Sequence, residues 1–369
     1  MTPVETDVVV VGGGGAGCST AWHLALRNTR VVLLERGLVG GQASGVNYGG
    51  VRQQGRDPAE LPISARSREI WQKLKSLIGT EAEYVVSGHL KLARNDEEAK
   101  DLERYLEVAA GYGLELRYLP EKELKQEFPW LGPKVVAGSY CATDGAANPR
   151  LLAPAIARAA RDAGADIRQQ AEVVDIAHDG DTFTVATKEA VFRAPVLVNT
   201  AGYWGGAIAE RFGEPAPISS FSPNMAVTEP IPYFIVPNLG VVGGDIYLRQ
   251  IDRGNVIFGG GRGFGDPERV RSRPSALRTM ESFALALELV PQLKGVEVIR
   301  SWTGIDGDMP DHIPVVGPSS TTKGLFHAFG FSGHGFQLGP GIGAIMSELV
   351  LDGKTPTPIE PLSIGRFAG

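Results

Sequence analysis

VVVVGGGGAG, at residues 8–17, joins a run of four valines to a run of glycines. The valines belong to a short β-branched run, Asp7–Val11, which predicts a strand. Gly17–Arg27 has apolar residues at helical spacing, and Val31–Leu34 predicts a second buried strand that ends at Glu35. Because a strand, a helix and a strand in this order pair in parallel through a crossover, the stretch predicts a parallel α/β unit at the start of the chain.

The glycines of this stretch have the spacing G-x-G-x-x-G, with Gly12, Gly14 and Gly17 at the turn between strand and helix. Such glycines allow a tight turn, close approach to a pyrophosphate and close packing of helix on strand. The helix N-terminus also favours an anion. Glu35 is placed to accept hydrogen bonds from a ribose diol. A glycine-rich turn without a ligand leaves Glu35 unexplained, so we predict a dinucleotide site.

Glycine is abundant throughout the chain, with 48 residues in 369, about 13% against a usual share of roughly 7%. Three further glycine-rich loops follow the first one, at 40–50, 199–206 and 329–343. A long ligand that the backbone approaches from several sides suits FAD better than NAD, because the flavin ring of FAD lies far from its adenine. We therefore expect FAD.

The composition excludes several classes of protein. The net charge of −6 and the lack of a basic stripe argue against nucleic acid as a partner. Two cysteines, Cys18 and Cys141, are too few for a disulfide framework, and the histidines and cysteines show no metal-ligand spacing, so no metal is expected. No apolar run is long enough to span a membrane, and the acidic N-terminus is no signal peptide. We expect a cytoplasmic protein.

The pattern changes beyond the first unit. Helices are predicted around Ile70–Ile78, from Asn95–Asp96 to Ala109, around Leu152–Ala159 and at the end of the last glycine cluster. Extended segments at 85–92, 135–143, 225–228, 246–250, 256–258 and 296–303 favour a mostly antiparallel sheet. The fold class is therefore mixed α/β (α+β). We expect a discontinuous FAD-binding domain (1–83, 145–217 and 310–369) interleaved with a substrate-binding domain (84–144 and 218–309), whose antiparallel sheet is flanked by helices.

Six motifs follow one another along nearly the whole chain: DVVVVGGGGAG at 7–17 with Glu35, GGQASGVNYGG at 40–50, DGAANP at 144–149, VNTAGYW at 198–204, MPDHIPVVG at 309–317 and GFSGHGF at 330–336. In this order they resemble the FAD-dependent amine and amino-acid oxidoreductases of the D-amino-acid oxidase superfamily. The resemblance is nearest to sarcosine and glycine oxidases and to the β subunits of heteromeric proline, hydroxyproline and opine dehydrogenases. It implies a Rossmann-like FAD-binding domain.

The resemblance also implies which residues contact FAD. The late loop would close over the flavin ring, where backbone N–H groups stabilise negative charge on the reduced ring. Because no cysteine follows Cys141, the covalent linkage found in some relatives is not expected, and FAD would be bound non-covalently. The expected cofactor residues are Gly12, Gly14, Gly15, Ala16, Gly17, Glu35, Arg36, Gln42, Ala43, Ser44, Gly49, Gly50, Val173, Ala201, Gly202, Trp204, Gly333, His334, Gly335, Phe336 and Gln337.

On the substrate side, the resemblance implies hydride transfer from the carbon beside nitrogen to flavin N5, with the substrate carboxylate held by a cation. Arg52 matches the arginine that binds this carboxylate in sarcosine oxidase–like members. It could otherwise be a surface charge or a contact to the FAD phosphates. His334 would be a proton relay or a hydrogen-bond donor. We expect Arg52, Gln337 and His334 as the catalytic residues.

Two positions depart from the relatives. Sarcosine oxidases carry a lysine where this chain has Gln337, and D-amino-acid oxidases carry an arginine after a Thr-Gly pair that is here followed by Ile305 and Asp306. The carboxylate site is therefore expected to be less cationic. Asp306 would suit a larger substrate with a further cationic or hydroxyl group, such as an opine or hydroxyproline.

Three functions fit these features. The first is the catalytic β subunit of a heteromeric dehydrogenase that oxidises a secondary amino acid or opine to an imine, while a partner α subunit carries the electrons onward. The second is a stand-alone oxidase that produces hydrogen peroxide. The third is a flavin-binding subunit without chemistry of its own. Two cysteines cannot hold an iron–sulfur cluster, so any such centre would belong to the partner.

Overall fold

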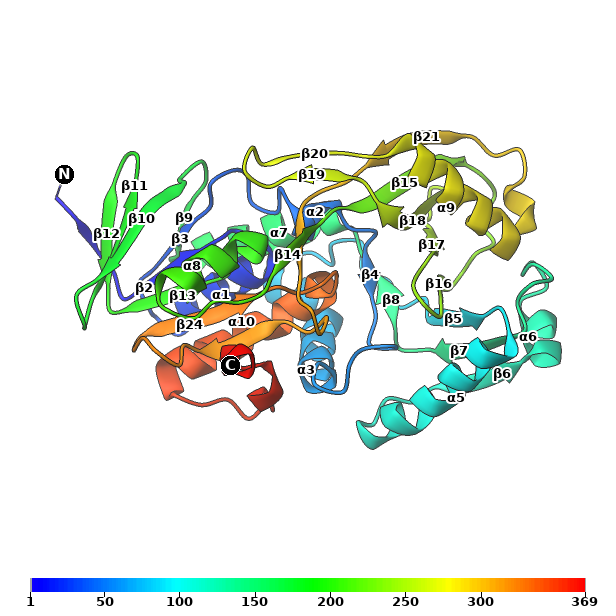
Figure 1. Cartoon of the computed structure of the whole chain (residues 1–369), viewed down its shortest axis with the longest axis horizontal. Helices are drawn as coiled ribbons and strands as arrows, with labels where there is room; N and C mark the ends of the chain where they lie inside the picture. The colour runs from blue at the N-terminus through cyan, green and yellow to red at the C-terminus, as the bar shows by residue number, and fades with distance from the viewer. Residues whose placement is uncertain (1, 369) are drawn as a thin grey trace.

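A largely parallel sheet at one end of the molecule and a mostly antiparallel sheet at the other organise the fold (Figure 1). The computed structural model describes residues 2–368. The six strands of the first sheet are all parallel to their neighbours except the edge strand β23, which is antiparallel to β24. Their order is β23 (Val315–Pro318), β24 (Leu325–Phe329), β13 (Val196–Asn199), β2 (Val8–Val11), β3 (Val31–Leu34) and β9 (Asp166–Arg168).

The valine run lies in the centre of this sheet, and the predicted strand–helix–strand unit is confirmed: β2, α1 (Gly15–Ala25) and β3, with β2 and β3 parallel. All four valines are buried. Val8 and Val10 pack with the helices, whereas Val9 and Val11 pack against a four-stranded sheet that covers the other face. Burial on both faces explains a continuous apolar strand. The covering sheet has the order β1 (Val4–Glu5), β12 (Val191–Ala194), β11 (Phe183–Thr187) and β10 (Val173–His178).

Three helices cover the other face: α1, α7 (Pro149–Asp162) and α10 (Gly335–Asp352). As predicted, α10 begins inside the last glycine cluster. It lies directly on α1, since a Cβ at Gly343 would be 2.2 Å from the hydroxyl oxygen of Ser19. Its first turn also contacts α3 (Leu61–Gln72). The predicted single helix around residues 70–78 is wrong, because Lys73 separates α3 from the short α4 (Leu74–Ile78).

The second sheet has eight strands and is mostly antiparallel, as predicted, with one parallel pair, β16 and β5. The strand expected at 85–92 is shorter, because Gly88 turns the chain with a φ of +80° and the ladder begins at His89. The order is β21 (Val298–Trp302), β15 (Pro223–Pro230), β18 (Asn255–Arg262), β17 (Tyr247–Gln250), β16 (Asn238–Val241), β5 (His89–Ala93), β7 (Ala137–Cys141) and β6 (Arg117–Pro120).

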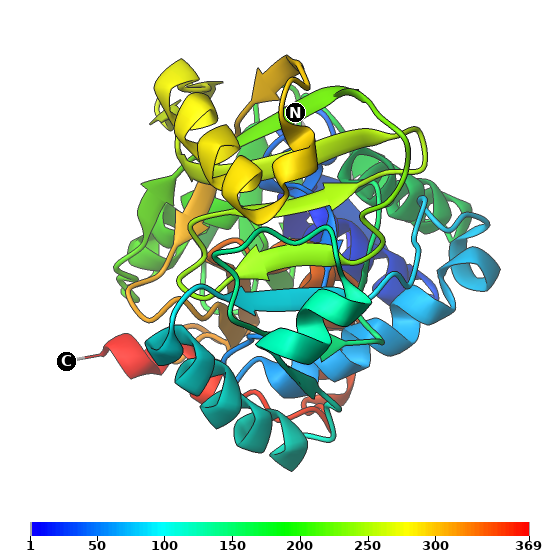
Figure 2. The same ribbon diagram turned by 90° about the vertical axis from the view of Figure 1, so that its right-hand side faces the viewer.

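The two faces of this sheet have different neighbours. One face carries leucine, valine and phenylalanine side chains that pack against α9 (Ala276–Leu289). In Figure 2 this helix lies in front of the sheet, and α6 (Glu121–Glu127) packs on the same face, whereas α5 (Asp96–Gly111) packs on the other face through Leu102 and Ala109. The side chain of Asn95 accepts from the N–H of Glu98 and caps α5, as predicted. The opposite face of the sheet is turned toward the glycine-rich loops.

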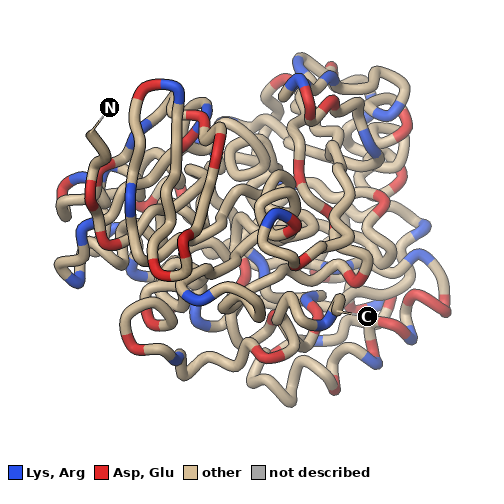
Figure 3. Tube along the Cα trace, turned by 60° about the vertical axis from the view of Figure 1, so that its left-hand side comes forward, with Lys and Arg blue, Asp and Glu red and all other residues tan. Residues whose placement is uncertain are grey.

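Short strand pairs join these parts: β4 (Gly50–Val51) with β8 (Gly145–Ala146), β14 (Ser219–Phe221) with β22 (Asp306–Asp308), and β19 (Phe264–Asp266) with β20 (Arg271–Arg273). The two large sheets draw on alternating stretches of the chain, and the domain boundaries given above remain a proposal. Positive and negative side chains are interspersed along the trace (Figure 3). Among residues 2–368, none of the helices combines the length and the hydropathy that a membrane-spanning segment needs.

Candidate functional site

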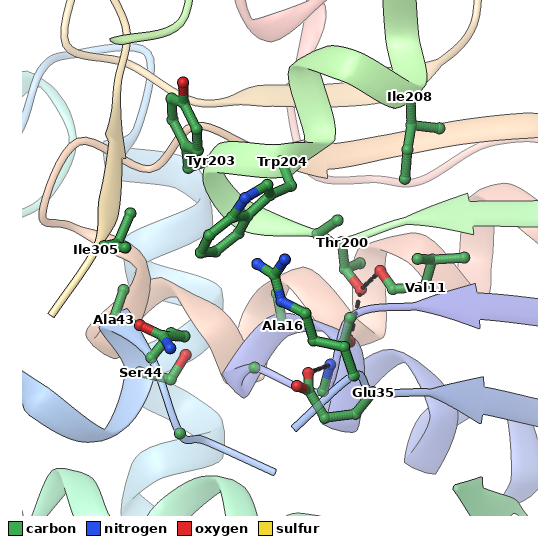
Figure 4. Close-up of a pocket in the computed structure, with 18 of the residues that line it drawn as sticks. Val11, Ala16, Glu35, Ala43, Ser44, Thr200, Tyr203, Trp204, Ile208 and Ile305 are labelled. Carbon is green, nitrogen blue, oxygen red and sulfur yellow. Dashed lines mark hydrogen bonds between the residues drawn. The ribbon is translucent and has the colours of Figure 1, made fainter. Parts of the chain in front are cut away.

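A cavity of about 380 Å³ lies where the glycine-rich loops meet (Figure 4). Its walls come from five stretches that are far apart in sequence: 11–16, 34–47, 172–176, 200–211 and 305–336. These stretches follow the ends of β2, β3, β13 and β24 or lie beside them, which is where open α/β sheets bind ligands. Every expected cofactor residue lines this cavity except Gly17, Gly49, Gly50, His334 and Gln337.

The carboxylate of Glu35 holds the first glycine loop. It accepts 2.7 Å hydrogen bonds from the N–H groups of Gly13 and Gly37. Beside it, the guanidinium carbon of Arg36 lies 3.5 Å from the ring centroid of Trp204, a cation–π contact between two walls of the cavity. Figure 4 shows Glu35 at the end of β3 and Trp204 in the turn Gly202–Trp204 that follows β13, with β2 between the two strands. Glu35 thus positions the loop that any phosphate group would contact.

Two hydroxyl groups join the walls. The N–H of Gly15, at the start of α1, donates to the Ser44 hydroxyl at 2.9 Å, which holds α2 (Ala43–Val46) against the helix terminus. Thr200 donates to the carbonyl oxygens of Val11 and Gly12 at 2.9 and 3.0 Å. Sequence reasoning did not single out Thr200, although it lies inside the VNTAGYW motif.

The late loop forms the far end of the cavity through Gly333, Gly335 and Phe336. Asp306 lies there too, accepting from the N–H groups of Gly307 at 2.8 Å and Gly333 at 3.2 Å. Burial raises the pKa of Asp306 to about 6. This carboxylate is therefore tied to the loop backbone.

The side chain of Gln337 points away from the cavity. It is 1% exposed, and its amide exchanges hydrogen bonds with the hydroxyl and the carbonyl oxygen of Ser64 at 3.0 and 2.9 Å. The backbone carbonyl oxygen of Gln337 accepts from the indole N–H of Trp71, which lies on α3 like Ser64. Both polar atoms of its side chain and its carbonyl oxygen are thus bonded to α3, and this geometry does not favour the expected contact with substrate.

His334 belongs to a buried polar pair. Its Nδ1 lies 2.9 Å from both carboxylate oxygens of Glu60, which is fully buried. Burial, followed by the charge of Arg56, lowers the pKa of His334 to about 4. Burial alone would raise the pKa of Glu60, but His334, Arg56 and Arg52 lower it. A neutral imidazole therefore donates from Nδ1 to an ionised Glu60, which leaves Nε2 as an acceptor. No sequence pattern pointed to Glu60.

Arg52 directly follows β4, beside Arg56 and Lys91 of β5, and it is not among the residues that line the cavity. Its Nη1 donates to the carbonyl oxygen of Gln54 at 2.5 Å. Arg56 is 3% exposed, and its Nη1 has no hydrogen-bond partner among the described residues. The remaining expected residues act in packing: Gly17 lies on the backbone of Gly12, Gly49 on that of Ala147, and Gly50 beneath the ring of Tyr48. In residues 2–368, no three His, Cys, Asp or Glu side chains lie together so that they could hold a metal ion.

Comparison with known families decides the assignment. The model of the family DAO, described as FAD dependent oxidoreductase, matches residues 7–349. The chain belongs to this family. It is an FAD-dependent oxidoreductase, as the sequence motifs predicted.

Individual DAO relatives extend over nearly the whole chain. The glycine oxidase of Geobacillus kaustophilus is 29% identical over 98% of this chain and 97% of its own length. The sarcosine oxidase subunit beta of Rhodobacter capsulatus is 28% identical over 96% and 87%. The crystal structure of L-proline dehydrogenase from P. horikoshii has a TM-score of 0.92 and 29% identity, and covers 100% of this chain and 99% of that one. The chain spans only 44% of the human dimethylglycine dehydrogenase that it also matches.

The cavity walls fit FAD, the cofactor of the DAO family. Gly12 has a φ of +106°, and a Cβ there would lie 2.4 Å from the carbonyl oxygen of Thr200, so the protein's own packing requires glycine. Gly15 differs, because a Cβ there would meet only the Ser44 hydroxyl, at 3.7 Å. No protein atom therefore requires glycine at position 15. Glycine is expected at such a position of a cavity wall when a ligand approaches the backbone closely.

Proposed function

We propose that this chain oxidises a small amino acid at the bond between its α-carbon and its nitrogen, with non-covalently bound FAD in the cavity as electron acceptor. The observation that carries the proposal is the position of Arg52. It follows the cofactor loop 40–50 directly, it lies in none of the ion pairs among the described residues, and it is only partly buried. An arginine with unused donors beside a flavin site is suited to a substrate carboxylate.

The protein's own groups would do three things. The first glycine loop, with the N-terminus of α1, would bind the pyrophosphate, and the late loop 333–336 would cover the flavin ring. When bound, FAD supplies a two-electron acceptor for a substrate that loses hydrogen from carbon and a proton from nitrogen. Arg52 would orient the substrate carboxylate, and His334 would accept a hydrogen bond or a proton at Nε2. Neither cysteine lines the cavity, which supports non-covalent binding.

We further propose that the substrate is a secondary amino acid and that the chain is the β subunit of a heteromeric dehydrogenase. The proline dehydrogenase and the sarcosine oxidase subunit beta support this choice. The stand-alone oxidase is the second candidate, favoured by the full-length similarity to a glycine oxidase. A cytoplasmic location stays a prediction.

The test is anaerobic mixing of the purified protein, reconstituted with FAD, with a panel of primary, N-methylated and cyclic amino acids and opines. Loss of the oxidised flavin absorbance names the substrate, and admission of air then separates oxidase from dehydrogenase. Arg52→Met should raise the substrate's dissociation constant about 10- to 100-fold. The control Arg158→Met changes an exposed residue of α7 and should leave the dissociation constant of the substrate unchanged. Protein that binds FAD but is reduced by no amine, with or without a partner subunit, would favour the non-catalytic reading.

A further inference from the structure

We propose that Lys91 of β5 is a specificity-determining residue, holding the substrate carboxylate together with Arg52. The inference rests on the proposed function and deepens it. Lys91 would be the second cation that contacts the substrate carboxylate, a role that the uncharged Gln337 of α10 does not fill.

The head groups of Lys91 and Arg52 converge on one point. A Cβ built on Gly55 would lie 3.0 Å from Lys91 Nζ and 3.5 Å from Arg52 Nη1, so the two nitrogens are at most about 6.5 Å apart. Two cations at such a separation can bind the two oxygens of one carboxylate. Gly55 has a φ of +75°, and its missing side chain leaves the space over it open to both head groups.

These cations have no anionic partner among residues 2–368. Lys91 and Arg56, like Arg52, take part in no salt bridge there, and Nη1 of the buried Arg56 is unpaired. The carboxylates nearby have other hydrogen-bond partners. Asp144 accepts from the N–H groups of Gln53 and Gln54, and Glu60 accepts from His334. Because unpaired buried charge is costly, a site with this excess of positive charge favours an anionic ligand.

Burial and the neighbouring positive charge both lower the pKa of Lys91. Burial, followed by the charge of Arg52, lowers its pKa to about 8, although Asp101 opposes the shift. The ammonium group lies 6.0 Å from the ring centroid of Tyr105. An arriving carboxylate would supply the counter-charge that this position lacks.

The register of the eight-stranded sheet places Lys91 on the face that is turned toward the cofactor loop. Residues that pair across neighbouring strands form one row on this face, in the order Trp302, Met225, Gly259, Tyr247, Gly240, Lys91 and Ser139. The ring of Tyr247 in this row packs at a tilt against Tyr48, with ring centroids 4.7 Å apart, and Trp302 donates to the carbonyl oxygen of Val46.

Gly240 stands between Tyr247 and Lys91 in this row, and the imidazole of His89 lies over it, because a Cβ on Gly240 would be 3.3 Å from Nε2 of that histidine. The substrate carboxylate would therefore lie over Gly55, between the head groups of Lys91 and Arg52. The ligand class is a small amino acid whose carboxylate is required for binding.

The experiment uses the FAD-loaded protein and the substrate identified by the panel. Lys91→Met should raise KM, and the dissociation constant of acetate measured by calorimetry, about 10- to 100-fold, with a much smaller change in kcat. Lys91→Arg should restore most of the affinity. Lys122→Met, at an exposed position on α6, is the matched control and should leave both constants unchanged.

A substrate analogue that lacks the carboxylate separates this role from a structural one. It should react equally with the wild type and Lys91→Met. A loss of turnover with the analogue as well, or an unchanged KM and acetate affinity in Lys91→Met, would overturn the Lys91 assignment alone. A wild-type protein that no amino acid reduces would instead overturn the proposed function.

Discussion

The carboxylate of Glu214 lies 3.1 Å from Nε2 of His327, and both side chains are almost completely buried. The Nδ1 of His327 lies 3.2 Å from the amide nitrogen of Asn199, whose oxygen accepts from the N–H of Ala201 at 3.3 Å. The imidazole of His327 thus joins the carboxylate of Glu214 to the amide of Asn199. This chain of hydrogen bonds ends at the loop 200–204, which lines the FAD cavity.

We predict that Glu214→Ala lowers the free energy of unfolding by about 3 kcal/mol and weakens FAD binding, because it leaves His327 and Ser320 without their buried acceptor. Burial alone would raise the pKa of Glu214, but hydrogen bonds from His327, Ser319 and Ser320 hold it at about 2. Chemical denaturation and FAD titration measure the two effects. Glu210→Ala, exposed on α8 (Gly205–Arg211), is the control, and equal stabilities of the two variants would contradict the prediction.

Two glycines of the first loop should separate folding from cofactor binding. Gly15→Ala should leave the thermal stability of the FAD-free protein nearly unchanged but raise the dissociation constant of FAD about 10-fold or more, since its Cβ has room in the protein and enters the cavity wall. Gly17→Ala should destabilise the FAD-free protein itself, because its Cβ would collide with the carbonyl oxygen of Gly12. Thermal unfolding and flavin fluorescence titration measure these effects. A Gly15→Ala protein with wild-type FAD affinity would show that Gly15 does not contact the cofactor.

The protein should lose stability in acid. The pKa of His334 is lowered to about 4 in the folded protein, against about 6.5 for a free imidazole, so the unfolded chain binds more protons between these values. The contribution of His334 is therefore present above about pH 6.5 and is lost as the pH falls toward about 4. Burial lowers the pKa of His23 to about 4 as well, and it acts in the same direction.

His334→Asn should flatten this pH dependence, as measured by urea unfolding between about pH 4 and pH 7. Asparagine retains a donor for Glu60 but does not titrate. His312→Asn is the control, because His312 is exposed and asparagine tolerates its φ of +59°. A slope unchanged from the wild type in His334→Asn would mean that His334 is not the titrating group.

Gln337 should matter for stability and not for substrate binding. Gln337→Met removes both hydrogen bonds to Ser64 while keeping the volume, so we expect a loss of about 1–3 kcal/mol in the free energy of unfolding. KM should stay at the wild-type value. The reverse result, an intact stability with a raised KM, would restore the role in substrate binding that the sequence resemblance suggested.

The sequence by itself determined the fold class, the family and the cofactor. Local signals were sufficient, because the valine run, the glycine spacing and Glu35 act within one strand–helix–strand unit whose geometry is fixed over short range. The antiparallel sheet could be predicted from its strands, whereas the break at Lys73 could not, since both sides of it have helical spacing. The late start of β5 depended on Gly88, whose positive φ the strand pattern did not reveal.

Only the tertiary structure decided which side chains meet. His334 and Gln337 lie one turn apart on the same face at the start of α10, where they contact Glu60 and Ser64, one turn apart at the start of α3. The sequence pattern of neither segment shows that the two helices meet. Lys91 lies on β5 and Arg52 follows β4, and their head groups converge over Gly55. Charge and spacing along the chain hold no information on such long-range contacts. These depend on how the two large sheets pack against the loops between them.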